Sequence, residues 1–64
     1  MLHYIKLAKD ELLSVHGQIN YCMNCINSGT LAEWEVKEYK QVIKDNLVKS
    51  RELKERIEWM ESEL

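Results

Sequence analysis

The chain has 64 residues and a formal net charge of −2, so it makes one small domain and is not basic overall, as nucleic-acid-binding domains usually are. A domain of this size rarely buries enough apolar surface to be stable alone, and it usually needs disulfides, a metal or a partner subunit. The sequence contains no proline and only two glycines, a composition that favours helices, and we expect a single all-α domain over residues 1–64.

No stretch of the sequence approaches the roughly 18 consecutive apolar residues of a membrane-spanning helix. Lys6 interrupts the apolar N-terminal residues too early for a signal peptide. Cys22 and Cys25 are three residues apart, and on a helix this spacing does not bring two sulfur atoms into disulfide geometry. We therefore expect a reduced, cytoplasmic protein that does not act at a membrane.

Residues 2–27 are predicted to form the first helix. From Met1 to Ile26, apolar residues recur at alternating intervals of four and three residues, which is the spacing of a coiled-coil seam. A stripe wider than this seam is typical of a helix packed in a bundle. Apolar residues widen the seam on both of its edges, namely Leu2, Leu13, Met23 and Tyr4.

Residues 27–30, Asn-Ser-Gly-Thr, are predicted to form a tight turn. Gly29 can adopt the left-handed conformation that ends a helix. Thr30 and Glu33 have the spacing of a capping box, in which each side chain accepts a hydrogen bond from a free backbone N–H at the start of the next helix. A connection this short makes the two helices lie side by side and antiparallel.

Residues 31–64 are predicted to form the second helix, with a seam that faces the first. Pairing Ile26 with Ala32 across a tight turn sets seam residue against seam residue along the hairpin, as far as Met1 and Ile57. We expect this seam to drive folding and self-association. It comprises Ile5, Leu12, Val15, Ile19, Ile26, Val36, Tyr39, Ile43, Leu53 and Ile57.

Two polar residues, Asn46 and Ser50, interrupt the second seam. A polar residue at such a position costs stability but can fix register or oligomeric state. We expect a local shift in which Leu47 replaces Asn46. In the predicted register the second helix is longer than the first by about two turns, so residues beyond about 57 should extend past its partner helix.

The hairpin leaves apolar residues on its edges, and a second hairpin would cover them in a four-helix bundle. These edge residues are Leu2, Tyr4, Leu13, Met23, Val42 and Leu47. In length and architecture, such a homodimer is similar to the Rop-type RNA-binding hairpin dimers. The likeness is one of shape without a shared motif, so it carries no function across.

Cys22 and Cys25 form a Cys-x-x-Cys pair, but a structural zinc site needs four ligands. His3 is about 30 Å from Cys22 along a helix, and a redox pair favours a helix N-terminus over this C-terminal position. We interpret both as packing cysteines, with a metal bridged between two chains as the alternative. His16 is interpreted as half-buried at the bundle edge, or else as a pH-sensitive contact between subunits.

No glycine-rich phosphate loop and no nucleophile–base set appears, so we expect no enzymatic activity and no cofactor. The favoured hypothesis is a protein–protein interaction module that acts as a regulator, inhibitor or adaptor. Its expected partner-binding residues are Trp34, Trp59, Met60, Leu64 and Tyr21. A second hypothesis is a Rop-like nucleic-acid-binding dimer that uses a basic stripe of Lys37, Lys40, Lys44 and Arg51. A third is a structural subunit of a larger assembly.

Overall fold

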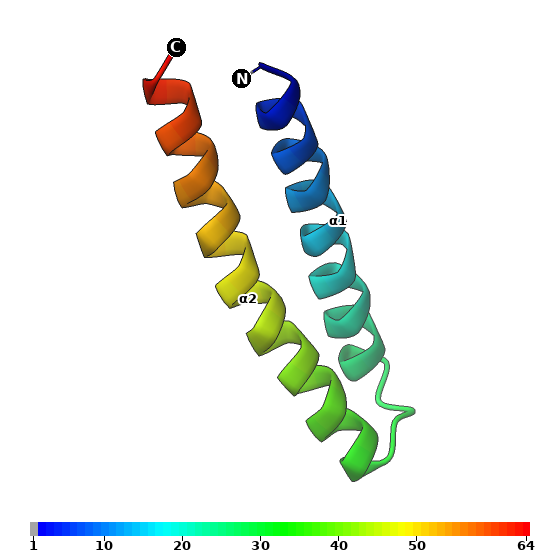
Figure 1. Ribbon diagram of the computed structural model, residues 1–64. Coiled ribbons are helices and arrows are strands. Elements are labelled where there is room, and N and C mark those ends of the chain that lie inside the picture. Colours follow the sequence, from blue (N-terminus) through cyan, green and yellow to red (C-terminus); the bar gives the residue numbers. More distant parts are fainter. Residues whose placement is uncertain (1) are drawn as a thin grey trace.

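A computed structural model describes residues 2–64 as two long helices that lie side by side and antiparallel (Figure 1). Helix α1 spans Leu2–Asn27 and helix α2 spans Glu33–Ser62. The pair measures 48 × 14 × 12 Å along its principal axes. The predicted all-α hairpin is therefore confirmed. Met1, which the predicted seam included, lies outside the described residues.

Neither helix of residues 2–64 combines the length and the apolar character that crossing a membrane requires. The chain forms helices because apolar residues at heptad spacing give each helix one face to bury against the other. The buried positions alternate with exposed ones along both helices. This pattern produces a two-layer structure with a single line of core residues between the layers.

The connection between the helices starts as predicted and ends differently. Gly29 has a φ of 72°, which confirms its left-handed conformation. The Ser28 hydroxyl donates to the Cys25 carbonyl at 2.6 Å and also pairs with the Thr30 hydroxyl at 2.9 Å. Because Thr30 is engaged there, it does not cap α2, and that prediction is wrong.

Helix α2 begins two residues later than predicted, at Glu33, and Ala32 is its N-cap residue. The backbone N–H of Ala32 donates to Oε1 of Glu35 at 3.1 Å. Alanine has no side-chain acceptor, so only this half of a capping box is present. The connection therefore covers residues 28–32, and its extra length lets α2 start beyond the end of α1 (Figure 1).

The predicted register is also wrong, by one heptad. Ile5 and Ala8 share a core cluster with Ile57 and Met60, whereas the tight turn would have placed Ile5 opposite Leu53. Residues seven apart occupy the same side of a helix, so a shift of seven leaves the same faces in contact. The longer connection accommodates the shifted register, in which Met60 joins the core and Ala32 is exposed.

This register reverses the expected overhang. Met60 is only 6% exposed in the core, and the Lys9 ammonium lies 3.2 Å from a carboxylate oxygen of Glu61. The start of α1 and the end of α2 lie level at what we call the open end, while the start of α2 projects past α1 at the connection end (Figure 1). The prediction that residues beyond 57 are unsupported is therefore wrong. The prediction that Met60 faces outward is wrong for the same reason.

Asn46 and Ser50 are both buried in the seam. The Asn46 amide donates to Oε1 of Gln18 at 3.2 Å, and Nε2 of His16 lies 3.0 Å from the Ser50 hydroxyl. Leu47 is 56% exposed, so the predicted shift of Leu47 into the seam does not occur. Because each buried polar group has a hydrogen-bond partner, its burial costs little free energy. The helix therefore does not rotate to expose it.

The buried residues are concentrated away from the connection. Among residues 2–64 they lie between Ile5 and Cys22 on α1 and between Asn46 and Met60 on α2. The seam residues nearer the connection are only half-buried. These are Ile26, Val36, Tyr39 and Ile43.

Candidate functional site

Two long faces flank the core, and each is built from residues that recur every seven positions. The first, which we call the His16 face, carries Lys9, His16 and Met23 on α1, and Lys40, Leu47, Lys54 and Glu61 on α2. The second, which we call the Gln18 face, carries Tyr4, Glu11 and Gln18 on α1, and Val42, Lys49 and Arg56 on α2. In an antiparallel pair, matching heptad positions of the two helices lie on the same side.

The His16 face contains two apolar grooves that follow each other along the hairpin. One, of about 670 Å³, lies toward the open end between Leu13 and Ile57. The other, of about 480 Å³, lies toward the connection end between Met23 and Leu47. Leu13, Met23 and Leu47 are 70%, 48% and 56% exposed, so this face presents apolar side chains to solvent over most of its length.

The Gln18 face has smaller grooves and is polar at its centre. Its grooves have volumes of about 280 and 390 Å³ and are separated along the hairpin. Between them Lys49 and Glu11 form an ion pair at 3.4 Å, and the Asn46–Gln18 hydrogen bond crosses from helix to helix. The centre of this face is therefore closed by bonds within the chain.

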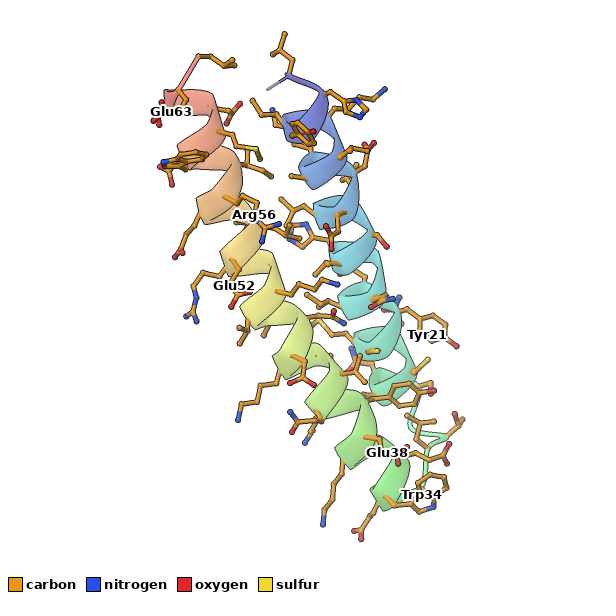
Figure 2. All side chains as sticks on the ribbon, viewed as in Figure 1. Tyr21, Trp34, Glu38, Glu52, Arg56 and Glu63 are labelled. Atoms are coloured by element: carbon orange, nitrogen blue, oxygen red, sulfur yellow. The ribbon has the colours of Figure 1, made fainter. Side chains whose placement is uncertain are left out.

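The aromatic residues predicted to bind a partner do not form one patch. Trp34 and Trp59 are 62% and 60% exposed, but they lie near opposite ends of α2, about 38 Å apart along its axis. Figure 2 shows Trp34 at the connection end and Tyr21 pointing outward from α1. Leu64 is exposed at the open end.

Tyr21 belongs to a small cluster with the cysteines. The pKa of its hydroxyl lies above the usual value, first because of a hydrogen bond with the Cys25 side chain, then because of the negative charges that Cys25 and Tyr39 acquire on ionising. The ring therefore stays neutral at physiological pH and offers a mainly apolar surface.

Cys22 is buried in the seam and Cys25 is half-buried, and both are free thiols. The burial of Cys22 agrees with the interpretation that it packs in the core. Within residues 2–64, no three potential metal ligands of the His, Cys, Asp or Glu type come together. A metal bridged between two chains stays a prediction.

The predicted basic residues Lys37, Lys40, Lys44 and Arg51 are all exposed on α2. Over residues 2–64, none of the four takes part in an ion pair, because the two ion pairs there join Lys9 with Glu61 and Lys49 with Glu11. Our sequence reasoning did not single out Lys54, which lines the larger groove. Lys54 is seven residues from both Leu47 and Glu61, and this spacing indicates that it lies on the same side of α2 as they do.

No protein-family model, no curated protein and no solved structure matches this chain. The function of the chain is therefore inferred from its surfaces. They consist of one long apolar face, one partly closed face and separate aromatic residues at both ends of α2. Surfaces of this kind are suited to binding other macromolecules.

Proposed function

We propose that this protein is a cytoplasmic, non-enzymatic protein–protein interaction module that acts as a homodimer and serves as a regulator, inhibitor or adaptor of another protein. The observation that carries the proposal is the amount of apolar surface left uncovered. Among residues 2–64, twelve large apolar or aromatic side chains are exposed, against eight apolar residues that are buried. The free thiols of Cys22 and Cys25 support a reducing compartment.

A homodimer would cover part of this exposed surface. Two helices alone bury one line of side chains, and no large side chain among residues 2–64 is less than 2% exposed. A second hairpin packed on one long face would turn that line into the interior of a four-helix bundle. It would also supply the additional burial that chains below about 70 residues need.

Solution mass tests the homodimer. We expect light scattering to give about twice the 7.6 kDa mass of the chain over a wide range of concentrations. Circular dichroism on the same samples should show a mainly helical chain. A helical chain that stays monomeric at high concentration would contradict the homodimer, and a mass that keeps rising would favour an assembly subunit instead.

The partner surface is tested at Trp59, which is exposed near the open end. We expect Trp59→Ala to reduce capture of the partner from a lysate while helicity and dimer mass stay unchanged, because an exposed aromatic anchor contributes to binding and not to the core. Met60→Ala is the contrasting variant: Met60 is buried, so its truncation should lower the stability of the hairpin. If Trp59→Ala dissolves the dimer, Trp59 belongs to the self-association interface.

One observation favours a second candidate function, nucleic-acid binding. Lys37, Lys40, Lys44 and Arg51 are exposed and, within residues 2–64, free of ion pairs. Binding through such residues weakens steeply with salt because condensed counterions are released. Anisotropy of labelled RNA and DNA in low and high salt tests it, and no change at low salt would contradict it.

A further inference from the structure

We propose that the His16 face binds an amphipathic helix of a partner protein, and that this helix carries Asp and Glu along one edge of its apolar stripe. This inference rests on the proposed interaction module and names the surface and the chemistry of its partner. Three observations support it: the separation of charge across the hairpin, the lack of ion pairs among the basic residues concerned and the apolar grooves beside them.

Basic residues are concentrated on one side of the hairpin. Seven of the nine Lys and Arg residues of the chain lie on the His16 face or next to it. On α1, Lys6 is seven residues from Leu13, which lines the larger groove, and Lys9 lines that groove itself. The other five recur along one side of α2 at intervals of three, four and seven residues, and we call them the basic edge. The basic edge is Lys37, Lys40, Lys44, Arg51 and Lys54.

Acidic residues are distributed in the opposite way. Only three of the eleven Asp and Glu residues lie on this side, namely Glu33, Glu58 and Glu61. All three lie beyond the ends of the basic edge, and Glu61 is paired with Lys9. Although the chain has a formal net charge of −2, its His16 side is therefore positive and the remaining sides are negative. A surface of this kind attracts an acidic partner and repels a basic one.

The basic edge is free of partners within the hairpin. Over residues 2–64 the two ion pairs join Lys9 with Glu61 and Lys49 with Glu11, so none of the five residues takes part in one. All five are exposed. They extend over about 26 Å of α2, at 1.5 Å per residue. The neighbouring edge of α1 carries the neutral Asn20 at its centre, so the carboxylates of a complementary partner belong on the side that faces α2.

The grooves beside the basic edge indicate that the partner is also apolar. They are lined by Leu13, Met23 and Leu47, which are 70%, 48% and 56% exposed. Leu13 and Met23 are ten residues apart, or about 15 Å along α1. A partner helix of three or more turns can cover both grooves with apolar residues at the spacing that helix-in-groove recognition uses.

Nucleic acid and a second copy of the hairpin fit this surface less well. Nucleic acids are bound mainly through phosphate contacts at polar interfaces, so they would leave the apolar grooves uncovered. Two copies docked through their His16 faces would bring two positive surfaces together, which is repulsive. The second copy of the proposed homodimer therefore belongs on another side. Trp59 also lies elsewhere, because it is seven residues from Glu52 and not from the basic edge.

Fluorescence anisotropy with synthetic peptides tests the partner chemistry. The probe is a labelled helical peptide of about 20 residues, long enough to cover both grooves, with leucine at heptad positions and glutamate along one edge. The comparison peptide has lysine in place of every glutamate. We expect the natural chain to bind the acidic peptide at least about tenfold more tightly than the basic one. This difference should shrink in high salt.

Two pairs of variants test the surface. K40Q/K54Q removes two charges from the basic edge, and its matched control, K49Q/R56Q, removes two charges from the Gln18 face. We expect the first to bind the acidic peptide at least about fivefold more weakly and the control to bind it like the natural chain.

The second pair tests the apolar grooves. Leu47→Ala should weaken binding at least about threefold. Its matched control is Leu7→Ala, which is similarly exposed, at 50% against 56%, but lines a groove of the Gln18 face. We expect this control to leave binding unchanged. Circular dichroism checks that all four variants stay helical.

The outcomes separate this inference from the proposed function. If the acidic peptide does not bind, or if both peptides bind equally well, this surface is wrong, while the homodimer and the role of Trp59 stand. If an RNA of similar length binds more tightly than the acidic peptide and depends on Lys40 and Lys54 but not on Leu47, the face binds nucleic acid and this inference is wrong. If the natural chain is monomeric but discriminates between the peptides as expected, the homodimer is wrong and this surface stands.

Discussion

The open end and the connection end of this hairpin are packed very differently. At the open end, a buried cluster is formed by Ile5, Ala8, Ile57 and Met60. Beside it, the Lys9–Glu61 ion pair joins the two helices. At the connection end, where the helices are covalently joined, Ile26 and the other seam residues are only half-buried. The connection therefore brings the helices together, but buried packing at the open end and in the middle of the hairpin holds them in register.

The largest expected difference between the two ends comes from truncating the same residue type in each. Ile57→Ala should cost about 2–5 kcal/mol of unfolding free energy, because it removes buried methylene groups and leaves a cavity. Ile26→Ala should cost about 1 kcal/mol, since that side chain is already partly solvated. Urea denaturation at one fixed protein concentration measures both. Equal losses would contradict the contrast between the ends.

A smaller effect is expected at the connection itself. Gly29→Ala should destabilise the hairpin by about 1 kcal/mol, because its φ of 72° is unfavourable for a residue with a Cβ atom. Gly17→Ala is the matched control, since this glycine is helical and an added methyl group meets nothing within 4 Å. We expect that control to stabilise by up to about 1 kcal/mol. Thermal unfolding of the pair should therefore shift in opposite directions.

At the open end, the Lys9–Glu61 ion pair should contribute less than the cluster beside it. Its side chains are 53% and 49% exposed, and an ion pair so accessible to solvent is worth about 0.2–1 kcal/mol. A double-mutant cycle with Lys9→Ala and Glu61→Ala measures this coupling directly. The coupling should shrink in high salt. A salt-independent coupling would mean that the pair is more buried than its exposure indicates.

The smallest effect is expected from lengthening the connection. Inserting two glycines after Gly29 should cost about 0.3 kcal/mol, because closing a slightly longer loop loses little additional entropy. The register should not change, since the cluster at the open end sets it. Denaturation midpoints give the cost, and a disulfide engineered between positions 5 and 60 reports the register. Failure of that disulfide to form only in the lengthened chain would show that the connection sets the register.

Several parts of the fold were predictable because they depend on local chemistry. The heptad spacing from Ile5 to Ile26 indicated which side of α1 is buried. Gly29 indicated where the chain turns, because glycine tolerates a left-handed backbone. The outward positions of Trp34, Trp59 and Tyr21 followed from the same helical periodicity.

The register was not predictable from the seam, because a seam with a period of seven is nearly unchanged by a shift of seven residues. The choice depended on how residues 28–32 close the gap between the helices, and Thr30 looked like a helix cap while its hydroxyl bonds to Ser28. The burial of Asn46 was missed for a related reason. Its partner Gln18 becomes a neighbour only in the observed register.

The two long faces of the candidate site could not be predicted from the sequence for the same reason. Each of their grooves is lined by residues from both helices, so the composition of a face depends on the register. Lys54 lies beside His16 and Leu13 only once α1 and α2 are aligned as observed.

The level chain ends have a mechanical consequence. Leu2 and Leu64 leave the hairpin at the same end (Figure 1), so tension between them would peel α1 from α2 like a zipper instead of shearing one along the other. The cluster of Ile5, Ala8, Ile57 and Met60 would bear the load first. The buried cluster of Val15, Ile19 and Leu53 would bear it next, so the hairpin should resist opening until the separation reaches the half-buried residues near the connection.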